Sequence, residues 1–182
     1  MTEILDKDEQ KFLLGLARQS ITHYLETGEM LANPVVKNKK LEENRGAFVT
    51  LKMDNQLRGC IGYPLPVKSL VETVMEMAVA AATQDYRFTP LNLEELSRTK
   101  IEISVLTLPQ PIKDISEIEV GKHGIIVSRG FCRGLLLPQV PLEYEWDRET
   151  FLRHGCLKAG LDEDEWKKGA RIEIFSAQVF SE

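Results

Sequence analysis

Leu57-Arg58-Gly59-Cys60-Ile61-Gly62 follows the run Ala47-Phe48-Val49-Thr50-Leu51-Lys52-Met53 after a short polar turn, Asp54-Asn55-Gln56. A strand, a turn and a second strand predict a β-hairpin that carries Arg-Gly-Cys in its return arm. Side chains alternate along a strand, which predicts two opposite faces: Leu57, Gly59 and Ile61 toward the core, and Arg58, Cys60 and Gly62 away from it. The hairpin is therefore expected to hold a thiol beside a permanent cation.

A thiol beside a cation is typical of a functional site. A neighbouring cation favours the thiolate form of a cysteine such as Cys60 over the thiol. Gly59 and Gly62 carry no side chain, so they are expected to leave room for a ligand to approach the main chain.

The overall composition narrows the class of protein. The chain has 182 residues, 43% of them hydrophobic and 28% charged, which is ordinary for one globular domain. Its formal net charge of -5 argues against general nucleic-acid binding. The three widely spaced cysteines form neither a disulfide framework nor a zinc pattern. The sequence shows no signal peptide and no membrane-spanning run, so we expect a cytoplasmic protein with reduced thiols.

Periodicity and capping signals predict three substantial helices and about six strands. The first expected helix spans residues 6–27, begins at Asp6 with Glu9 and ends at Gly28. The second spans residues 67–84 and begins with a capping box of Ser69 and Glu72. The third is a segment capped by Asp147. The expected strands beyond the first hairpin are residues 101–107, 125–128, 132–138 and 170–180, the last with a change of face near Phe175; residues 138–145 are expected to be loop. The pattern indicates an α+β fold with a mainly antiparallel sheet.

Two further features bear on the site. The second hairpin also carries Arg-Gly in its return arm, so Arg133 is expected to play a role related to that of Arg58. Asp85 and Arg87 flank a tyrosine after the second helix, where they either form a local ion pair or direct Arg87 into the cleft of Arg58.

The sequence leaves three kinds of site to consider: a catalytic cysteine, a metal site and a binding pocket. Cys60 and His123 could form a thiolate–imidazolium pair for nucleophilic catalysis, with Arg58 or Arg133 holding a substrate anion. The plainer alternative is that Cys60 packs as a small residue and His123 caps a turn. A metal site including His154 and Cys156 has little support because these residues lack chelating spacing, so no metal is expected. Lastly, Arg58, Arg87 and Arg133 could line a pocket of a binding module that performs no bond chemistry.

Several stretches in the same order resemble the AMMECR family, most closely its prokaryotic members called AmmeMemoRadiSam system protein A. The most specific are residues 57–62 and Arg133-Gly134-Leu135-Leu136-Leu137-Pro138-Gln139-Val140, and the others are Asp85-Tyr86-Arg87-Phe88, Ile101-Glu102-Ile103-Ser104-Val105-Leu106, Gly121-Lys122-His123-Gly124, Trp146-Asp147 and Cys156-Leu157-Lys158-Ala159-Gly160-Leu161. One departure from the family pattern is Tyr63, which would narrow a pocket there.

The resemblance implies a single domain over residues 1–182 made of two packed subdomains, the larger with an antiparallel sheet flanked by helices. It implies action alongside a Memo-type protein and a radical SAM protein, but it brings no agreed activity and leaves the cofactor unknown. The family supplies no catalytic roles, so the candidate catalytic residues, Cys60 and His123, rest on their own chemistry. The candidate ligand-binding residues are Arg58, Gly59, Gly62, Arg87, Arg133 and Gln139. The sequence favours a small enzyme slightly over a scaffold subunit that binds an anionic ligand.

Overall fold

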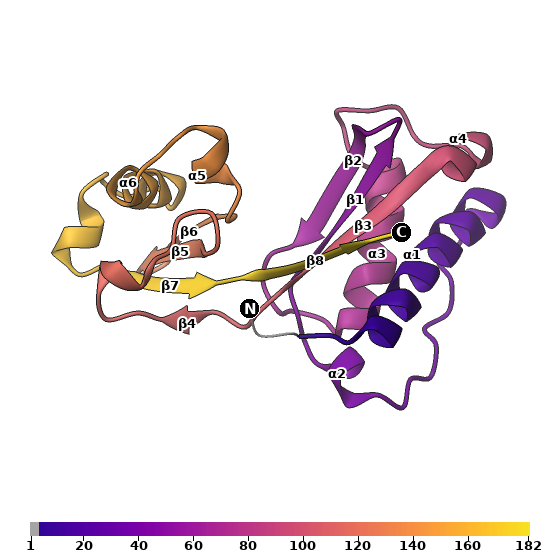
Figure 1. Cartoon of the computed structure of the whole chain (residues 1–182), viewed down its shortest axis with the longest axis horizontal. Helices are drawn as coiled ribbons and strands as arrows, with labels where there is room; N and C mark the ends of the chain where they lie inside the picture. Colours follow the sequence, from indigo (N-terminus) through magenta and orange to yellow (C-terminus); the bar gives the residue numbers. More distant parts are fainter. Residues whose placement is uncertain (1–3) are drawn as a thin grey trace. The chain divides into compact units, whose positions relative to one another are not determined.

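The computed structural model describes residues 4–182 and divides the chain into two compact units. Unit 1 holds the chain up to Leu106 together with Gln178–Glu182, and unit 2 holds Thr107–Ala177. Each unit contains one four-stranded sheet, in the orders β2-β1-β3-β8 and β4-β7-β5-β6 (Figure 1). Helices and antiparallel sheets confirm the predicted α+β class.

The sheet of unit 1 is built around the predicted hairpin, β1 (Ala47–Met53) and β2 (Gln56–Tyr63). On its other side β1 pairs antiparallel with β3 (Thr99–Leu106), which lies next to β8 (Ala177–Ser181). The turn of the hairpin consists of Asp54 and Asn55, whose φ values of 52° and 62° are both left-handed. Asp and Asn tolerate this conformation better than other residues with a side chain, which explains their place in a tight turn.

A bulge in β2 corrects the predicted division of its faces. Leu51 pairs with Gly59 but the next residue, Lys52, pairs with Leu57, so Arg58 is the extra residue. A bulge displaces the alternation of side chains. Leu57 is therefore 42% exposed, and the expectation that it faces the core was wrong. Ile61 does pack against the core.

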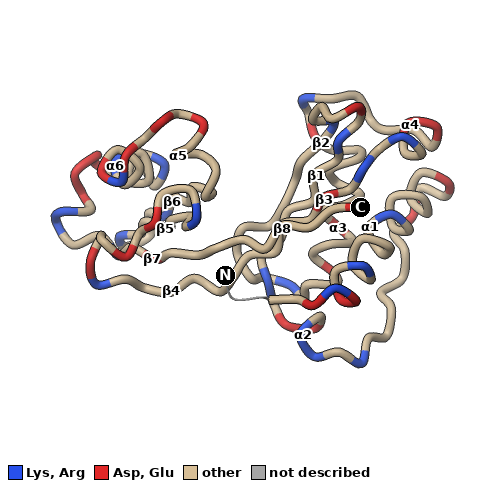
Figure 2. The backbone as a smooth tube through the Cα atoms, in the orientation of Figure 1, with Lys and Arg blue, Asp and Glu red and all other residues tan. Residues whose placement is uncertain are grey.

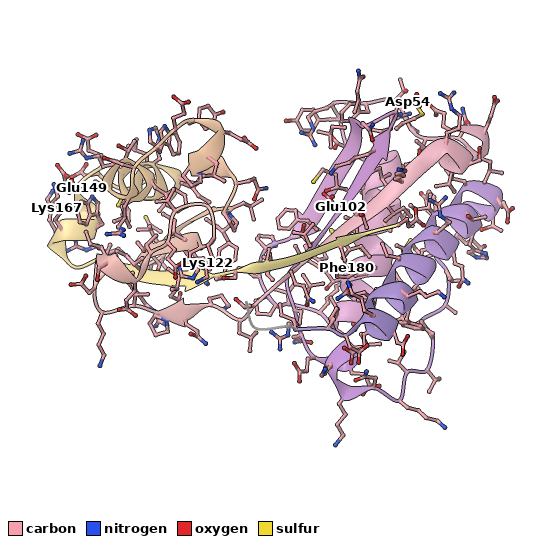
Figure 3. All side chains as sticks on the ribbon, in the orientation of Figure 1. Asp54, Glu102, Lys122, Glu149, Lys167 and Phe180 are labelled. Carbon is pink, nitrogen blue, oxygen red and sulfur yellow. The ribbon has the colours of Figure 1, made fainter. Side chains whose placement is uncertain are left out.

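Two helices, α1 (Lys7–Thr27) and α3 (Leu70–Thr83), contact each other and pack on the sheet of unit 1 (Figure 1). Both begin with the predicted capping boxes, Asp6 with Glu9 and Ser69 with Glu72. The small apolar end of α3, Ala78–Ala82, is buried. Phe180 of β8 joins the same core (Figure 3). Two short helices complete the unit, α2 (Lys39–Glu42) and α4 (Leu93–Arg98).

Unit 2 packs α6 (Arg148–Lys158) on the sheet formed by β4 (Gln110–Pro111), β5 (Gly124–Arg129), β6 (Cys132–Leu136) and β7 (Arg171–Phe175). Asp147 caps α6 as predicted. Gly134 and Gly155 allow the close approach, because a Cβ at Gly134 would lie 2.3 Å from the backbone nitrogen of Ala159. Short helical turns occur at η1 (Ile115–Glu117) and η2 (Glu165–Lys168).

Two expectations in this part of the chain were wrong. Residues 138–145 are not all loop, because α5 (Val140–Glu143) forms a short helix there. The expected last strand is two strands, β7 and β8, in different sheets. The change of face near Phe175 is therefore the point where the chain leaves one sheet for the other. A main-chain hydrogen bond from the N–H of Thr107 to the carbonyl oxygen of Ser176, 2.9 Å long, stabilises this crossing.

Candidate functional site

Cys60 lies on the face of the unit 1 sheet opposite α3. Ala47, Val49 and Leu51 of β1 are fully buried on the helix side. Thr50 therefore points to the other face, together with its direct cross-strand partner Cys60. The hydroxyl of Thr50 donates a hydrogen bond to Cys60 Sγ at 3.2 Å. Among the residues described, unit 1 has no helix packed on this face, and the thiol is partly exposed.

The segment after α3 closes the free edge of β2 at this residue. Cys60 donates its backbone N–H to Asp85 Oδ2 at 2.8 Å, and Arg87 Nη2 approaches the Cys60 carbonyl oxygen at 3.4 Å. The Asp85 carboxylate thus accepts the hydrogen bond that a carbonyl group of a neighbouring strand would accept. The Arg87 guanidinium donates the hydrogen bond that an N–H group of that strand would donate. Asp85 and Arg87 substitute for the missing strand at an otherwise unpaired edge.

The two side chains also bind each other in a bidentate ion pair. Arg87 donates from Nε to Asp85 Oδ1 at 2.9 Å and from Nη2 to Oδ2 at 2.7 Å. These bonds, helped by the N–H groups of Cys60 and Arg87, hold the pKa of Asp85 well below its usual range despite the opposing effect of burial. The same bonds raise the pKa of Arg87. The predicted local ion pair is confirmed, and it fixes the main chain of Cys60.

Arg58 is buried at the bulge, with its donors used inside unit 1. Its Nη1 donates to the Thr89 carbonyl at 2.9 Å, and its Nη2 lies 3.2 Å from each carboxylate oxygen of Glu95. The guanidinium carbons of Arg58 and Arg87 lie 6.0 and 5.5 Å from the ring centroid of Phe88. Both guanidinium groups thus lie near the same ring. The hydrogen bonds of Arg58, in contrast, stabilise the segment that connects α3 and α4.

The two glycines of β2 do not leave the expected open space where a side chain would project. A Cβ at Gly59 would lie 2.1 Å from the carbonyl oxygen of Ala81 in α3. A Cβ at Gly62 would lie 2.4 Å from the ring of Phe48. Both positions therefore require glycine for packing. Their role in ligand binding stays a prediction, limited to their main-chain groups.

The remaining candidates belong to unit 2. His123 accepts a hydrogen bond at Nδ1 from the backbone N–H of Glu119 at 3.1 Å, so it caps the turn before β5. Arg133 of β6 is exposed, with Nη2 at 3.7 Å from Glu173 Oε2. Gln139 is exposed at the start of α5, where its side chain makes no capping bond. Because Cys60 and His123 lie in different units, their pairing stays a prediction.

Two residues around Cys60 were missed by the sequence analysis. Thr50 was not singled out, although the register of the hairpin places it directly opposite Cys60. Asp85 was recognised as a partner of Arg87 but not of Cys60, because the approach of the α3–α4 connection to the edge of β2 is a tertiary contact without a local signal.

Neither a metal centre nor a membrane helix is evident in the described part of the chain. Residues 4–182 contain no group of three His, Cys, Asp or Glu side chains placed to hold a metal ion. Cys156 is buried in α6, and His154 stacks on Trp146 with centroids 3.8 Å apart. No helix within these residues combines the length and apolar character needed to cross a membrane.

Comparison with known proteins agrees with the resemblance seen in the motifs. The sequence model of the AMMECR1 family matches residues 14–180. Protein MK0488 of Methanopyrus kandleri is 50% identical over an alignment that covers all of this chain and 92% of that protein. Protein MJ0810 of Methanocaldococcus jannaschii is 44% identical, with 98% and 92% covered.

The same fold occurs in a solved structure. It is the crystal structure described as uncharacterized protein PH0010 from Pyrococcus horikoshii. It is 41% identical in sequence, superposes with a TM-score of 0.83, and the match covers 99% of this chain and 94% of that chain. None of these names specifies an activity.

Proposed function

The chain belongs to the AMMECR1 family, and from this premise we propose that it is a small enzyme whose nucleophile is Cys60. The observation that carries the proposal is the hydrogen bond from Thr50 Oγ1 to Cys60 Sγ, 3.2 Å long, on a face that no helix of unit 1 covers within residues 4–182. A hydroxyl donor stabilises negative charge as it develops on sulfur. Thiol chemistry of this kind also suits the cytoplasm, where cysteines stay reduced.

The geometry supports attack by the sulfur on the carbonyl carbon of a small acyl substrate. A C–S bond forms while the bond to the leaving group breaks, and the leaving group departs with the bonding electrons and the proton that the thiol has lost. Water then releases the product by hydrolysing the covalent intermediate. Asp85 and Arg87 support this step by fixing the backbone of Cys60 at both its N–H and its carbonyl group.

The part that His123 could play is restricted by its hydrogen bond. Its Nδ1 accepts the N–H of Glu119, so the proton of the neutral ring is on Nε2. In this tautomer Nε2 can donate a hydrogen bond but cannot abstract a proton. We propose this role for His123 in place of proton abstraction at Nε2.

The test is the rate of Cys60 alkylation by iodoacetamide at neutral pH, followed by peptide mass spectrometry. The exposed Cys132 of the same molecule provides the internal reference. We expect Cys60 to react despite its partial burial, and to slow about tenfold in Thr50→Val, as expected for loss of one hydrogen bond to a charged group. An inert Cys60 in the folded protein, or equal rates in wild type and Thr50→Val, would reject the nucleophile.

A binding subunit for an anionic ligand is the second candidate. The observation in its favour is Arg133, whose side chain is 45% exposed and whose contact with Glu173 is longer than a hydrogen bond. Arg58 supports it less, because Glu95 and Thr89 already occupy its donors. An unreactive Cys60 together with anion binding that depends on Arg133 would favour this candidate over the enzyme.

We also propose, from the family resemblance, that the protein acts alongside a Memo-type protein and a radical SAM protein. Tyr86, 96% exposed between Asp85 and Arg87, is a suitable contact beside Cys60. Size-exclusion chromatography of the purified proteins, singly and mixed, tests this partnership. Co-elution that Tyr86→Ala weakens would support it, and separate elution in every mixture would count against a stable complex.

A further inference from the structure

Three neighbouring strands of unit 2 place two arginines and a serine in one row. Ser128 of β5 pairs directly with Arg133 of β6 on one side and with Arg171 of β7 on the other. Directly paired residues project from the same face of a sheet. Strands lie about 4.8 Å apart, so the Cα atoms of the two arginines are about 10 Å apart, with the serine hydroxyl between them.

This face is the one opposite α6. A Cβ at Gly134 would lie against Lys158 and Ala159 at the end of α6, and a Cβ at Gly155 of α6 would meet Val127. Because neighbouring residues alternate, Arg133 and Ser128 point away from the helix. The arginine side chains are accessible, 45% exposed for Arg133 and 63% for Arg171. Figure 2 shows basic positions along these strands.

Glu173 brings the two guanidinium groups together. Its Oε1 accepts a hydrogen bond from Arg171 Nη2 at 2.9 Å, and its Oε2 lies 3.7 Å from Arg133 Nη2. One carboxylate thus faces two guanidinium groups, which leaves a net positive charge. The Arg133 contact is too long for a hydrogen bond, so its donors remain available. The described residues also provide no hydrogen-bond partner for the hydroxyl of Ser128.

We propose that this row, Arg133, Ser128 and Arg171, binds the phosphate group of a phosphomonoester. A phosphate carries about -1.5 to -2 charges and three oxygens that accept hydrogen bonds, enough for both guanidinium groups and the hydroxyl. A carboxylate has one charge and two oxygens and matches the row less well. Glu173 holds the guanidinium groups in position, which reduces the cost of organising them on binding.

The row belongs to unit 2 and Cys60 to unit 1, and the phosphate proposal does not rest on the nucleophile proposal. It gives the second candidate function a ligand class, and it adds Ser128 and Arg171 to the Arg133 found from sequence. Its test involves no thiol, so failure here leaves the alkylation result unaffected.

Isothermal titration with inorganic phosphate and with glycerol phosphate, with acetate as the comparison, tests the proposal. Arg133→Gln and Arg171→Gln should each weaken phosphate binding about tenfold or more, since each removes hydrogen bonds to a charged ligand. Ser128→Ala should weaken it by a smaller factor. Arg98→Gln, which removes the same charge at an exposed pair with Asp54 in unit 1, should leave it unchanged.

Tighter binding of glycerol phosphate than of inorganic phosphate would identify an organic ligand, and equal binding would identify the phosphate group alone as the determinant. Acetate that binds as tightly as phosphate would overturn the assignment, as would equal effects of the row variants and Arg98→Gln. Amide chemical shifts of the wild-type protein give a second readout that requires no variant. Phosphate should shift the Ser128 amide, and a Ser128 amide that does not move at saturating phosphate would also reject the site.

Discussion

Asp85 accepts the backbone N–H of Cys60 at 2.8 Å, across 25 positions of sequence, and so replaces a strand at the edge of β2. The carboxylate is 4% exposed and its other contacts come from Arg87. A single buried side chain therefore determines both the protection of a sheet edge and the position of the candidate nucleophile.

Asp85→Asn should lower the free energy of unfolding at neutral pH by about 2 kcal/mol, because hydrogen bonds to a charged group are lost. The pKa of Asp85 is depressed in the folded state, so its contribution is present above the ordinary carboxyl pKa of about 3.9 and is lost as the pH falls below it. Urea unfolding between about pH 5 and pH 2 should show a smaller loss of stability for Asp85→Asn than for wild type.

Asp54→Asn is the matched control. Asp54 pairs with Arg98, but its side chain is 70% exposed, so its replacement should change stability by less than about 1 kcal/mol. If the free energy of unfolding fell equally with pH in wild type and Asp85→Asn, the ion pair of Asp85 with Arg87 would contribute nothing to acid sensitivity.

Gly59→Ala should destabilise the protein by about 2 kcal/mol or more, because the added methyl group would meet the backbone oxygen of Ala81. Gly15→Ala provides the opposite case. Gly15 is exposed within α1, a Cβ there would meet no atom within 4 Å, and alanine favours a helix by about 0.8–1 kcal/mol. Urea unfolding should therefore show a lower free energy of unfolding for Gly59→Ala and a higher one for Gly15→Ala, each relative to wild type. Equal stability of the two variants would contradict the close approach of β2 and α3.

Local patterns were enough to predict much of the fold. The capping boxes at Asp6 and Ser69, the hairpin turn at Asp54 and the Asp147 cap of α6 are encoded within a few residues, and the structure contains all of them. The passage of the last segment through two sheets could not be predicted in this way. An alternating pattern specifies a strand but not the sheet that it joins.

The surroundings of Cys60 show the same limit. Alternation predicted that Arg58 would share the face of Cys60, but the bulge places Arg58 where it binds Glu95, which follows much later in the chain. Asp85 reaches Cys60 by a tertiary contact as well. The motif itself was identifiable from sequence, whereas the partners of its side chains depend on packing between distant segments.

Arg58→Leu should lower the free energy of unfolding by about 3 kcal/mol, because it leaves the carboxylate of Glu95 and the carbonyl of Thr89 without their partner. Arg58→Lys should recover only part of this loss, since an ammonium group cannot contact both carboxylate oxygens and the carbonyl with the geometry of a guanidinium. Chemical denaturation measures both variants. The alkylation rate of Cys60 in folded Arg58→Lys should equal that of wild type, and a large change would show that Arg58 acts on the thiol after all.

The cysteines outside the candidate site should differ sharply in reactivity. Cys156 is fully buried in α6, and burial raises the pKa of its thiol, whereas Cys132 is exposed. N-ethylmaleimide should therefore modify Cys132 readily and Cys156 only as fast as the protein unfolds, so urea should accelerate the second reaction far more than the first. A raised pKa in the folded state stabilises the protein below the ordinary thiol pKa of about 8.5, and this contribution is lost at higher pH. Wild type should accordingly lose more stability than Cys156→Ala as the pH rises above that value. Modification of Cys156 at the same rate in water and in urea would show that α6 opens without global unfolding.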